Sequence, residues 1–237
     1  GYHAVIADTV NHRLRGLNLD TGVVTTLAGN GIQRLLDAEQ ARSEVGEDNE
    51  EAWLSDLGND PLNTSLSSPW DVLWSPKTDS VIIAMAGTHQ IFAFNPQTSA
   101  LSVFAGTGLE GLTDGAASES WFAQSSGLAL DKAENIWVAD SETSALRRLV
   151  LAEDGSVANV ETAIGAGLFD FGFRDGAAEA ARLQHPLGVA ALPDGSIAIA
   201  DTYNGAVRRY DPATATVSTL ARGLNEPADV QLDTSVD

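Results

Sequence analysis

Residues 197–209 read IAIADTYNGAVRR, and the same phrase occurs three more times in the chain. The other copies are VIADTVNHRLR at 5–15, IAMAGTHQI at 83–91 and IWVADSETSALRR at 136–148. Aligned in this way, the copies place Asp8, Gly87, Asp140 and Asp201 at one repeat position. Self-similarity at intervals of tens of residues indicates stacked supersecondary units. The repeat therefore predicts the architecture before any residue is given a chemical role.

Each copy lies in the same order of short elements, which predicts four antiparallel strands per unit. A Pro or small residue opens the first strand, as at 69–72 and 186–189. The apolar phrase forms the second strand, and alternating third and fourth strands follow a polar turn. Repeated four-stranded units are typical of a β-propeller, whereas a β-sandwich needs no equivalent copies. We expect an all-β propeller with four blades' worth of sequence, as a single domain over residues 1–237.

The two ends of the sequence are complementary. The sequence starts within a unit, at its second strand, and its last recognisable element is a first strand at 227–232. The two ends could share one blade and close a four-bladed ring. Alternatively, the chain is part of a larger ring, and fragments of this kind could associate with one another.

Composition excludes several classes of function. The chain has no cysteine, which excludes disulfides, thiolate catalysis and Cys–zinc sites. Its 33 acidic and 13 basic residues give a net charge of −20, which would repel nucleic acid. No apolar run reaches the roughly 18 residues of a membrane span, and no signal peptide is visible. We expect no nucleic-acid or membrane partner and a cytoplasmic location.

The irregular spacing of the copies locates three inserts, each between the fourth strand of one blade and the first strand of the next. The longest, residues 32–65, is strongly acidic. The other two resemble each other at 111–117 and 172–178 and predict a turn with one helical turn. In a blade, these connections lie on the same face as the turns between strands two and three. Function usually resides in loops that cluster on one end of a rigid scaffold.

The phrase at 7–15, together with the Pro186-Leu187-Gly188-Val189 lead-in to Ala200-Asp201-Thr202, resembles the NHL repeat over nearly the whole chain. The Asp-Gly pairs at 114–115 and 175–176 and the stretch 121–124 resemble the propeller of thioredoxin–NHL proteins, the bacterial relatives of NHL repeat-containing protein 2. That resemblance implies a six-bladed ring and a module of a larger redoxin-type protein. The excess of Arg over Lys and the abundant Ala favour a bacterial source.

Two aspartates are the best candidates for a metal site. Asp71 and Asp229 both open an innermost strand, so both could border the axial channel and hold Ca²⁺ with backbone carbonyls. His185 precedes Pro186 and could join them, which would give a metal-dependent hydrolase or lyase. The alternative is that these aspartates cap backbone N–H groups. Gly127 and Gly188 occupy the equivalent positions in the other two blades.

Other charged and imidazole side chains recur at fixed positions of the repeat. His12 and His89 are interpreted as turn residues. Asp8, Asp140 and Asp201 end the second strand and are expected to satisfy the backbone of their own turns. Arg15, Arg148 and Arg209 recur on the third strand, and we expect these arginines to pair with the three aspartates.

No nucleophile motif is present, so the sequence favours a non-catalytic binding platform for a protein or peptide, with no required cofactor. The expected contact residues are aromatic side chains on the insert-bearing face, because such side chains are effective anchors in interfaces. They are Trp53, Trp70, Phe169, Phe171, Phe173 and Tyr203, together with the acidic insert.

Overall fold

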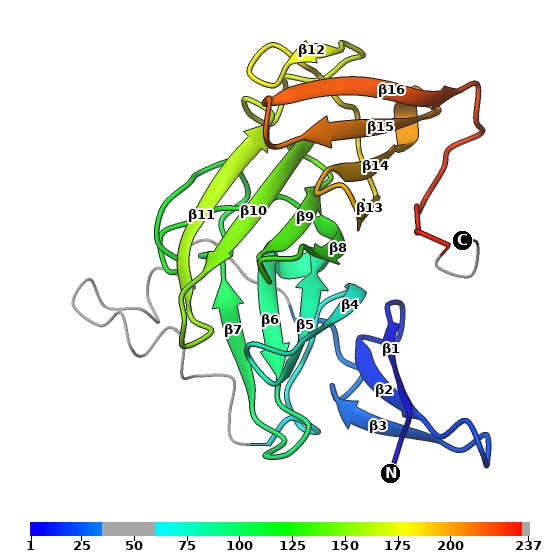
Figure 1. Cartoon of the computed structure of the whole chain (residues 1–237). Coiled ribbons are helices and arrows are strands. Elements are labelled where there is room, and N and C mark those ends of the chain that lie inside the picture. The colour runs from blue at the N-terminus through cyan, green and yellow to red at the C-terminus, as the bar shows by residue number, and fades with distance from the viewer. Residues whose placement is uncertain (35–59, 234–237) are drawn as a thin grey trace.

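The computed structural model describes residues 1–34 and 60–233, and these residues form four antiparallel β-sheets that follow one another around an arc (Figure 1). Trp53 and most of the acidic insert 32–65 lie outside the described residues. The first sheet has three strands. They are β1 (Ala4–Asp8), β2 (Arg13–Leu17) and β3 (Val24–Ala28).

The second and third sheets have the predicted four strands each, in simple up-and-down order. The second contains β4 (Pro69–Ser75), β5 (Ser80–Met85), β6 (Gln90–Phe94) and β7 (Leu101–Ala105). The third contains β8 (Ser125–Leu130), β9 (Ile136–Asp140), β10 (Ala145–Leu151) and β11 (Val157–Ile164).

The fourth sheet has a fifth, outer strand that the sequence did not predict. Its repeat strands are β13 (Gly188–Ala191), β14 (Ile197–Asp201), β15 (Ala206–Asp211) and β16 (Thr216–Arg222). The insert at 172–178 supplies β12 (Gly176–Ala177), which pairs with β16. In the third sheet, Gly115 of the related insert pairs with Val160 in the same way. Both inserts therefore wrap across the blade to its outer edge.

The apolar phrases of the second and third sheets are buried because each of these two sheets is covered on both sides by its neighbours. In β5, Ile82 and Ala84 belong to the core shared with the third sheet, whereas Ile83 and Met85 belong to the core shared with the first. Successive side chains of a strand point to opposite faces, so burial on both faces produces a continuous apolar run. The strands β1, β4, β8 and β13 lie next to one another along the inside of the arc (Figure 1).

The predicted first strand at 227–232 is not a strand in this structure, and the two ends do not share a blade. Residues 223–233 have no strand assignment, and within the described residues β1 pairs only with β2. Residues 228 and 229 instead pack against the start of β13, where a Cβ on Gly188 would lie 2.6 Å from the Cα of Asp229. Residues 228 and 229 thus pack against β13 in the same way as the start of β13 packs against β8.

The prediction that Arg148 and Arg209 pair with the repeat aspartates is wrong, because the arginine before each of them forms the pair. Arg147 and Arg208, both fully buried, bind Asp140 and Asp201 at 3.4 and 2.7 Å. The neighbouring arginines point to the other face of the strand, where Arg148 binds Glu161 and Arg209 binds Asp194. A register shift in each third strand, at Leu146/Arg147 and Val207/Arg208, accompanies this placement.

The first sheet follows the prediction, with Arg15 bound to Asp8 at 3.0 Å. In all three sheets the paired Asp and Arg are seven positions apart. That constant spacing was the signal in the sequence that identifies the correct arginines.

The second sheet replaces this ion pair with apolar side chains. Met85 and Asp201 both precede a short 3₁₀ turn, η1 (Ala86–Thr88) and η2 (Thr202–Asn204), so Met85, and not Gly87, corresponds to the repeat aspartate. Phe92, seven positions after Met85, is buried like Arg208. The Sδ of Met85 even accepts the backbone N–H of Ser67, as the carboxylate of Asp201 accepts that of Gln184.

Candidate binding face

The turns between the second and third strands meet the inter-sheet connections on one face, as predicted. Backbone N–H groups of Gly87, Glu142 and Tyr203 donate to carbonyls of the connecting segments at 3.0, 3.1 and 3.2 Å. The side chain of Asn204 donates to the carbonyl of Gly172 in the third insert. Loops that are tied to the blades in this way present their side chains from a rigid support.

Each connection, like the segment after β16, reaches the inside of the arc through a residue with left-handed backbone, and the preceding blade holds three of these four residues. These residues are Ser68, Gln124, His185 and Glu226, with φ between 46° and 53°. The Nδ1 atoms of His12 and His89 accept the N–H groups of Ser68 and Gln124 at 3.0 and 3.1 Å. The hydroxyl of Ser144 accepts the backbone N–H of His185. His12 and His89 are therefore turn residues that join neighbouring blades.

His185 also crosses between two sheets through its side chain. Its ring stacks on Tyr203 with centroids 4.5 Å apart, and its Nε2 lies 3.2 Å from a carboxylate oxygen of Glu142. Glu142 follows the third sheet's β9, and Tyr203 follows the fourth sheet's β14. The imidazole is thus part of the surface of the face. It does not line the axial pocket in which the two predicted aspartates lie.

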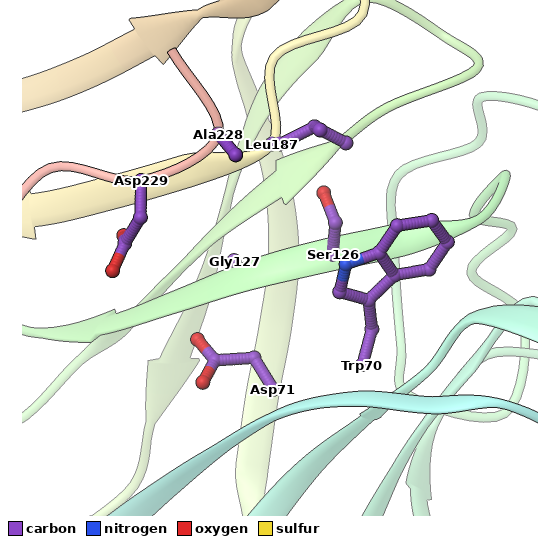
Figure 2. Close-up of a pocket in the computed structure, with 7 residues that line it drawn as sticks. All are labelled: Trp70, Asp71, Ser126, Gly127, Leu187, Ala228 and Asp229. Carbon is purple, nitrogen blue, oxygen red and sulfur yellow. The ribbon is translucent and has the colours of Figure 1, made fainter. Parts of the chain in front are cut away.

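The axial pocket is a cavity of 190 Å³ between the inner strands (Figure 2). Asp71 and Asp229 both direct their carboxylates into this space, from β4 and from the segment after β16. The indole of Trp70 and the backbone of β8 form further walls. The lining residues are Trp70, Asp71, Ser126, Gly127, Leu187, Ala228 and Asp229.

The two carboxylates have similar backbone contacts but different surroundings. Asp71 accepts the N–H of Val72 at 2.7 Å and that of Leu128, on the neighbouring sheet, at 2.8 Å. Asp229 accepts the N–H of Val230 at 2.8 Å and is exposed. Burial raises the pKa of Asp71, and the charge of Asp229 adds to this increase. Asp71 and Asp229 therefore both accept backbone N–H groups and line the axial pocket.

Glycine is required at the two equivalent positions because the inner strands approach one another closely there. A Cβ on Gly127 would lie 2.5 Å from the carbonyl oxygen of Leu187, and one on Gly188 would lie 2.6 Å from Oδ1 of Asp229. Separations below 3.0 Å require a shift of the backbone. The order Asp71, Gly127, Gly188 and Asp229 around the axis thus leaves the pocket open while the backbone segments remain in contact.

The described residues contain no group of three or more His, Asp or Glu side chains that could share a metal ion. Asp71 and Asp229 are together, whereas His185 is bound to Glu142 and Tyr203. Ca²⁺ takes six to eight oxygen ligands. Two carboxylates and neighbouring carbonyls would have to supply them here, so the predicted Ca²⁺ site remains a prediction.

Most of the predicted aromatic contact residues are exposed near this pocket or on the adjoining loops. The exposed fractions of Phe169, Phe171, Tyr203 and Trp70 are 92%, 49%, 59% and 46%. Phe173 differs, because its ring covers the guanidinium groups of Arg208 and Arg222 at 4.3 and 4.0 Å. It therefore shields the buried ion pair. Ser126 and Leu187 also line the pocket, but their repeat positions carry no distinctive chemistry from which this could be predicted.

The family model for the NHL repeat matches residues 183–210, which include β13, β14 and most of β15. The chain is 37% identical over 220 residues to Protein SUPPRESSOR OF QUENCHING 1, chloroplastic, of Arabidopsis thaliana, covering 91% of this chain and 19% of that protein. It is 35% identical over 252 residues to NHL repeat-containing protein 2 of Gallus gallus, covering 95% and 32%. The chain therefore spans a third or less of the length of these relatives.

Among solved structures, the fold resembles a structural genomics protein of unknown function from Bacteroides thetaiotaomicron. The TM-score is 0.60 at 20% identity, over 88% of this chain and 43% of that one. This likeness supports the propeller fold and nothing more specific. In the part of the chain that the structure describes, no helix is long and apolar enough to span a membrane.

Proposed function

This chain belongs to the NHL-repeat family, and we propose that it is a non-catalytic platform that binds a protein or peptide on its insert-bearing face. NHL-repeat propellers are typically interaction modules, and the relatives are several times longer than this chain. We further propose that it serves as a module of a longer, redoxin-type protein, as its resemblance to thioredoxin–NHL proteins implies, and that this protein is located in the cytoplasm.

The observation that carries the proposal is a set of solvent-exposed aromatic rings on rigidly held loops. Tyr203 is fixed by its N–H bond to the carbonyl of Gln184 and by stacking on His185. The loop that carries Phe169 and Phe171 is held by an ion pair between Asp170 and Arg182, at 2.6 Å. Exposed aromatic side chains on ordered loops lose little conformational entropy on binding and are frequent interface anchors.

Selection of peptides tests this proposal directly. A displayed library of random peptides is selected on the purified chain, and the affinities of enriched peptides are measured by fluorescence anisotropy. We expect Phe169→Ser and Tyr203→Ser each to weaken binding about tenfold, which corresponds to about 1.4 kcal/mol. Thermal unfolding of each variant shows whether the fold is intact.

Trp74→Ser is the matched control for these variants. Trp74 is 47% exposed, but it pairs with Val81 at the opposite end of the second sheet. Its loss should leave the affinity unchanged. Failure to enrich any peptide, or equal losses for Trp74→Ser and Tyr203→Ser, would contradict the proposed binding face.

A further inference from the structure

We propose that the axial pocket receives a lysine or arginine side chain of the bound protein or peptide, between Asp71, Asp229 and Trp70. This inference rests on the proposed binding function and specifies the chemistry of the partner. It concerns a cavity of 190 Å³ that opens between the inner strands, with both carboxylates directed into it (Figure 2).

The charge of the pocket is uncompensated. Within residues 1–34 and 60–233, neither Asp71 nor Asp229 forms an ion pair with a Lys, Arg or His side chain. Burial and the charge of Asp229 raise the pKa of Asp71, so the ionised pair is unfavourable as it stands. A cation placed between two such carboxylates removes their repulsion and gains two charge-assisted hydrogen bonds.

The wall formed by Trp70 fits an organic cation. Its indole is 46% exposed and lines the pocket on the side of Ser126, across from the two carboxylates (Figure 2). A cation over an indole face is attracted by the ring, and Trp is the strongest such acceptor. This chain already uses the arrangement elsewhere, with the guanidinium of Arg148 over the ring of Trp137 at 5.4 Å.

A side-chain cation suits the pocket better than a metal ion. The two oxygens of Asp71 already accept backbone N–H groups, and the described residues bring no third acidic or imidazole side chain to the pair. An ammonium group has three N–H donors and a guanidinium group has five, and the carboxylates can accept several of these, with carbonyls of the inner strands nearby. The aliphatic stem of the side chain would lie against Trp70 and Leu187.

The position of the pocket connects it to the aromatic binding face. Leu187 lines the pocket, and His185, two residues before it, stacks on the exposed ring of Tyr203. A peptide that crosses Tyr203 would therefore pass next to the pocket mouth. The net charge of −20 favours a partner that carries basic residues.

The test uses two blocked tripeptides, acetyl-Ala-Lys-Ala-amide and acetyl-Ala-norleucine-Ala-amide. They differ only in the charged group at the end of the central side chain. Binding is followed by NMR, through the backbone amide signals of Ser126 and Gly127. We expect the lysine peptide to shift these signals and the norleucine peptide to bind at least about fivefold more weakly, with the difference reduced in high salt.

Asp229→Asn is the principal variant, because Asp71 also caps Leu128 across two sheets and its replacement could disturb the fold. Asp229→Asn and Trp70→Ala should each weaken lysine-peptide binding severalfold, whereas Trp74→Ala, an equally exposed tryptophan at the opposite end of β4, should not. Equal binding of both peptides, or no shift with the lysine peptide, would overturn the inference.

The two proposals fail separately. If the peptides selected on the chain lose affinity with Phe169→Ser but not with Asp229→Asn, the binding face stands and the cation pocket is wrong. If the lysine tripeptide binds as expected but no peptide can be selected, the pocket stands and the peptide platform is wrong.

Discussion

The buried ion pair of the fourth sheet should be a large contributor to stability that an apolar pair can replace. Arg208 is fully buried and donates to Asp201 at 2.7 Å, to Asp175 at 2.5 Å and to the carbonyls of Arg182 and Arg174. Arg208→Met removes all of these bonds and leaves the carboxylate of Asp201 buried without a cation. Breaking one partner of such a pair costs about 3–5 kcal/mol.

The second sheet shows what a compatible apolar replacement looks like, with Met85 and Phe92 buried at the corresponding positions. The double variant Asp201→Met/Arg208→Phe should therefore be more stable than Arg208→Met, by about 2 kcal/mol, because no buried charge remains unpaired. Asp175 would lose its ion pair with Arg208, but it keeps the hydrogen bond from the hydroxyl of Thr219, and its side chain is 42% exposed and can be hydrated.

Urea unfolding followed by circular dichroism measures these differences, with the slope of the transition used to test for a single cooperative step. Arg209→Met is the control, since it lies on the neighbouring position and pairs with the exposed Asp194. Its cost should be no more than about 1 kcal/mol. Equal costs for Arg208→Met and Arg209→Met, or a double variant less stable than Arg208→Met, would refute the reasoning.

Two further predictions concern the inner strands and the outer turns. Gly127→Ala should cost about 1–3 kcal/mol, because its Cβ would lie 2.5 Å from the carbonyl oxygen of Leu187. Thermal unfolding checks this, and Gly195→Ala, at a site with open space but a positive φ of 87°, shows the cost of backbone strain alone. Hydrogen bonds from the hydroxyl and N–H of Ser196, then from Arg209, lower the pKa of Asp194 to about 2. Because that pKa lies below the usual 3.8, Asp194 should stabilise the fold above pH 4 and lose this contribution between about pH 4 and 2. The stability difference between the wild type and Asp194→Asn, measured by urea unfolding across this range, should shrink as the pH falls; a difference that does not change with pH would contradict it.

The sequence alone determined the propeller architecture, because each blade is specified by short-range patterns. Alternation along a strand has a period of two, and the four copies repeat the same turns at the same offsets. For this reason the second and third sheets contain the four strands per unit that the repeat predicts. The interpretation of His12 and His89 as turn residues followed from the same repeat positions.

The tertiary structure decided which side chains meet. The register shifts within β10 and β15 direct Arg147 and Arg208 to the buried aspartates in place of their neighbours. Asp71 and Asp229 converge because β4 and the segment after β16 approach one another across the inside of the arc, whereas His185 turns outward to Glu142 and Tyr203. Such convergence depends on the angles between sheets and on local bulges, which are set by packing of the whole core and not by any one segment of the sequence.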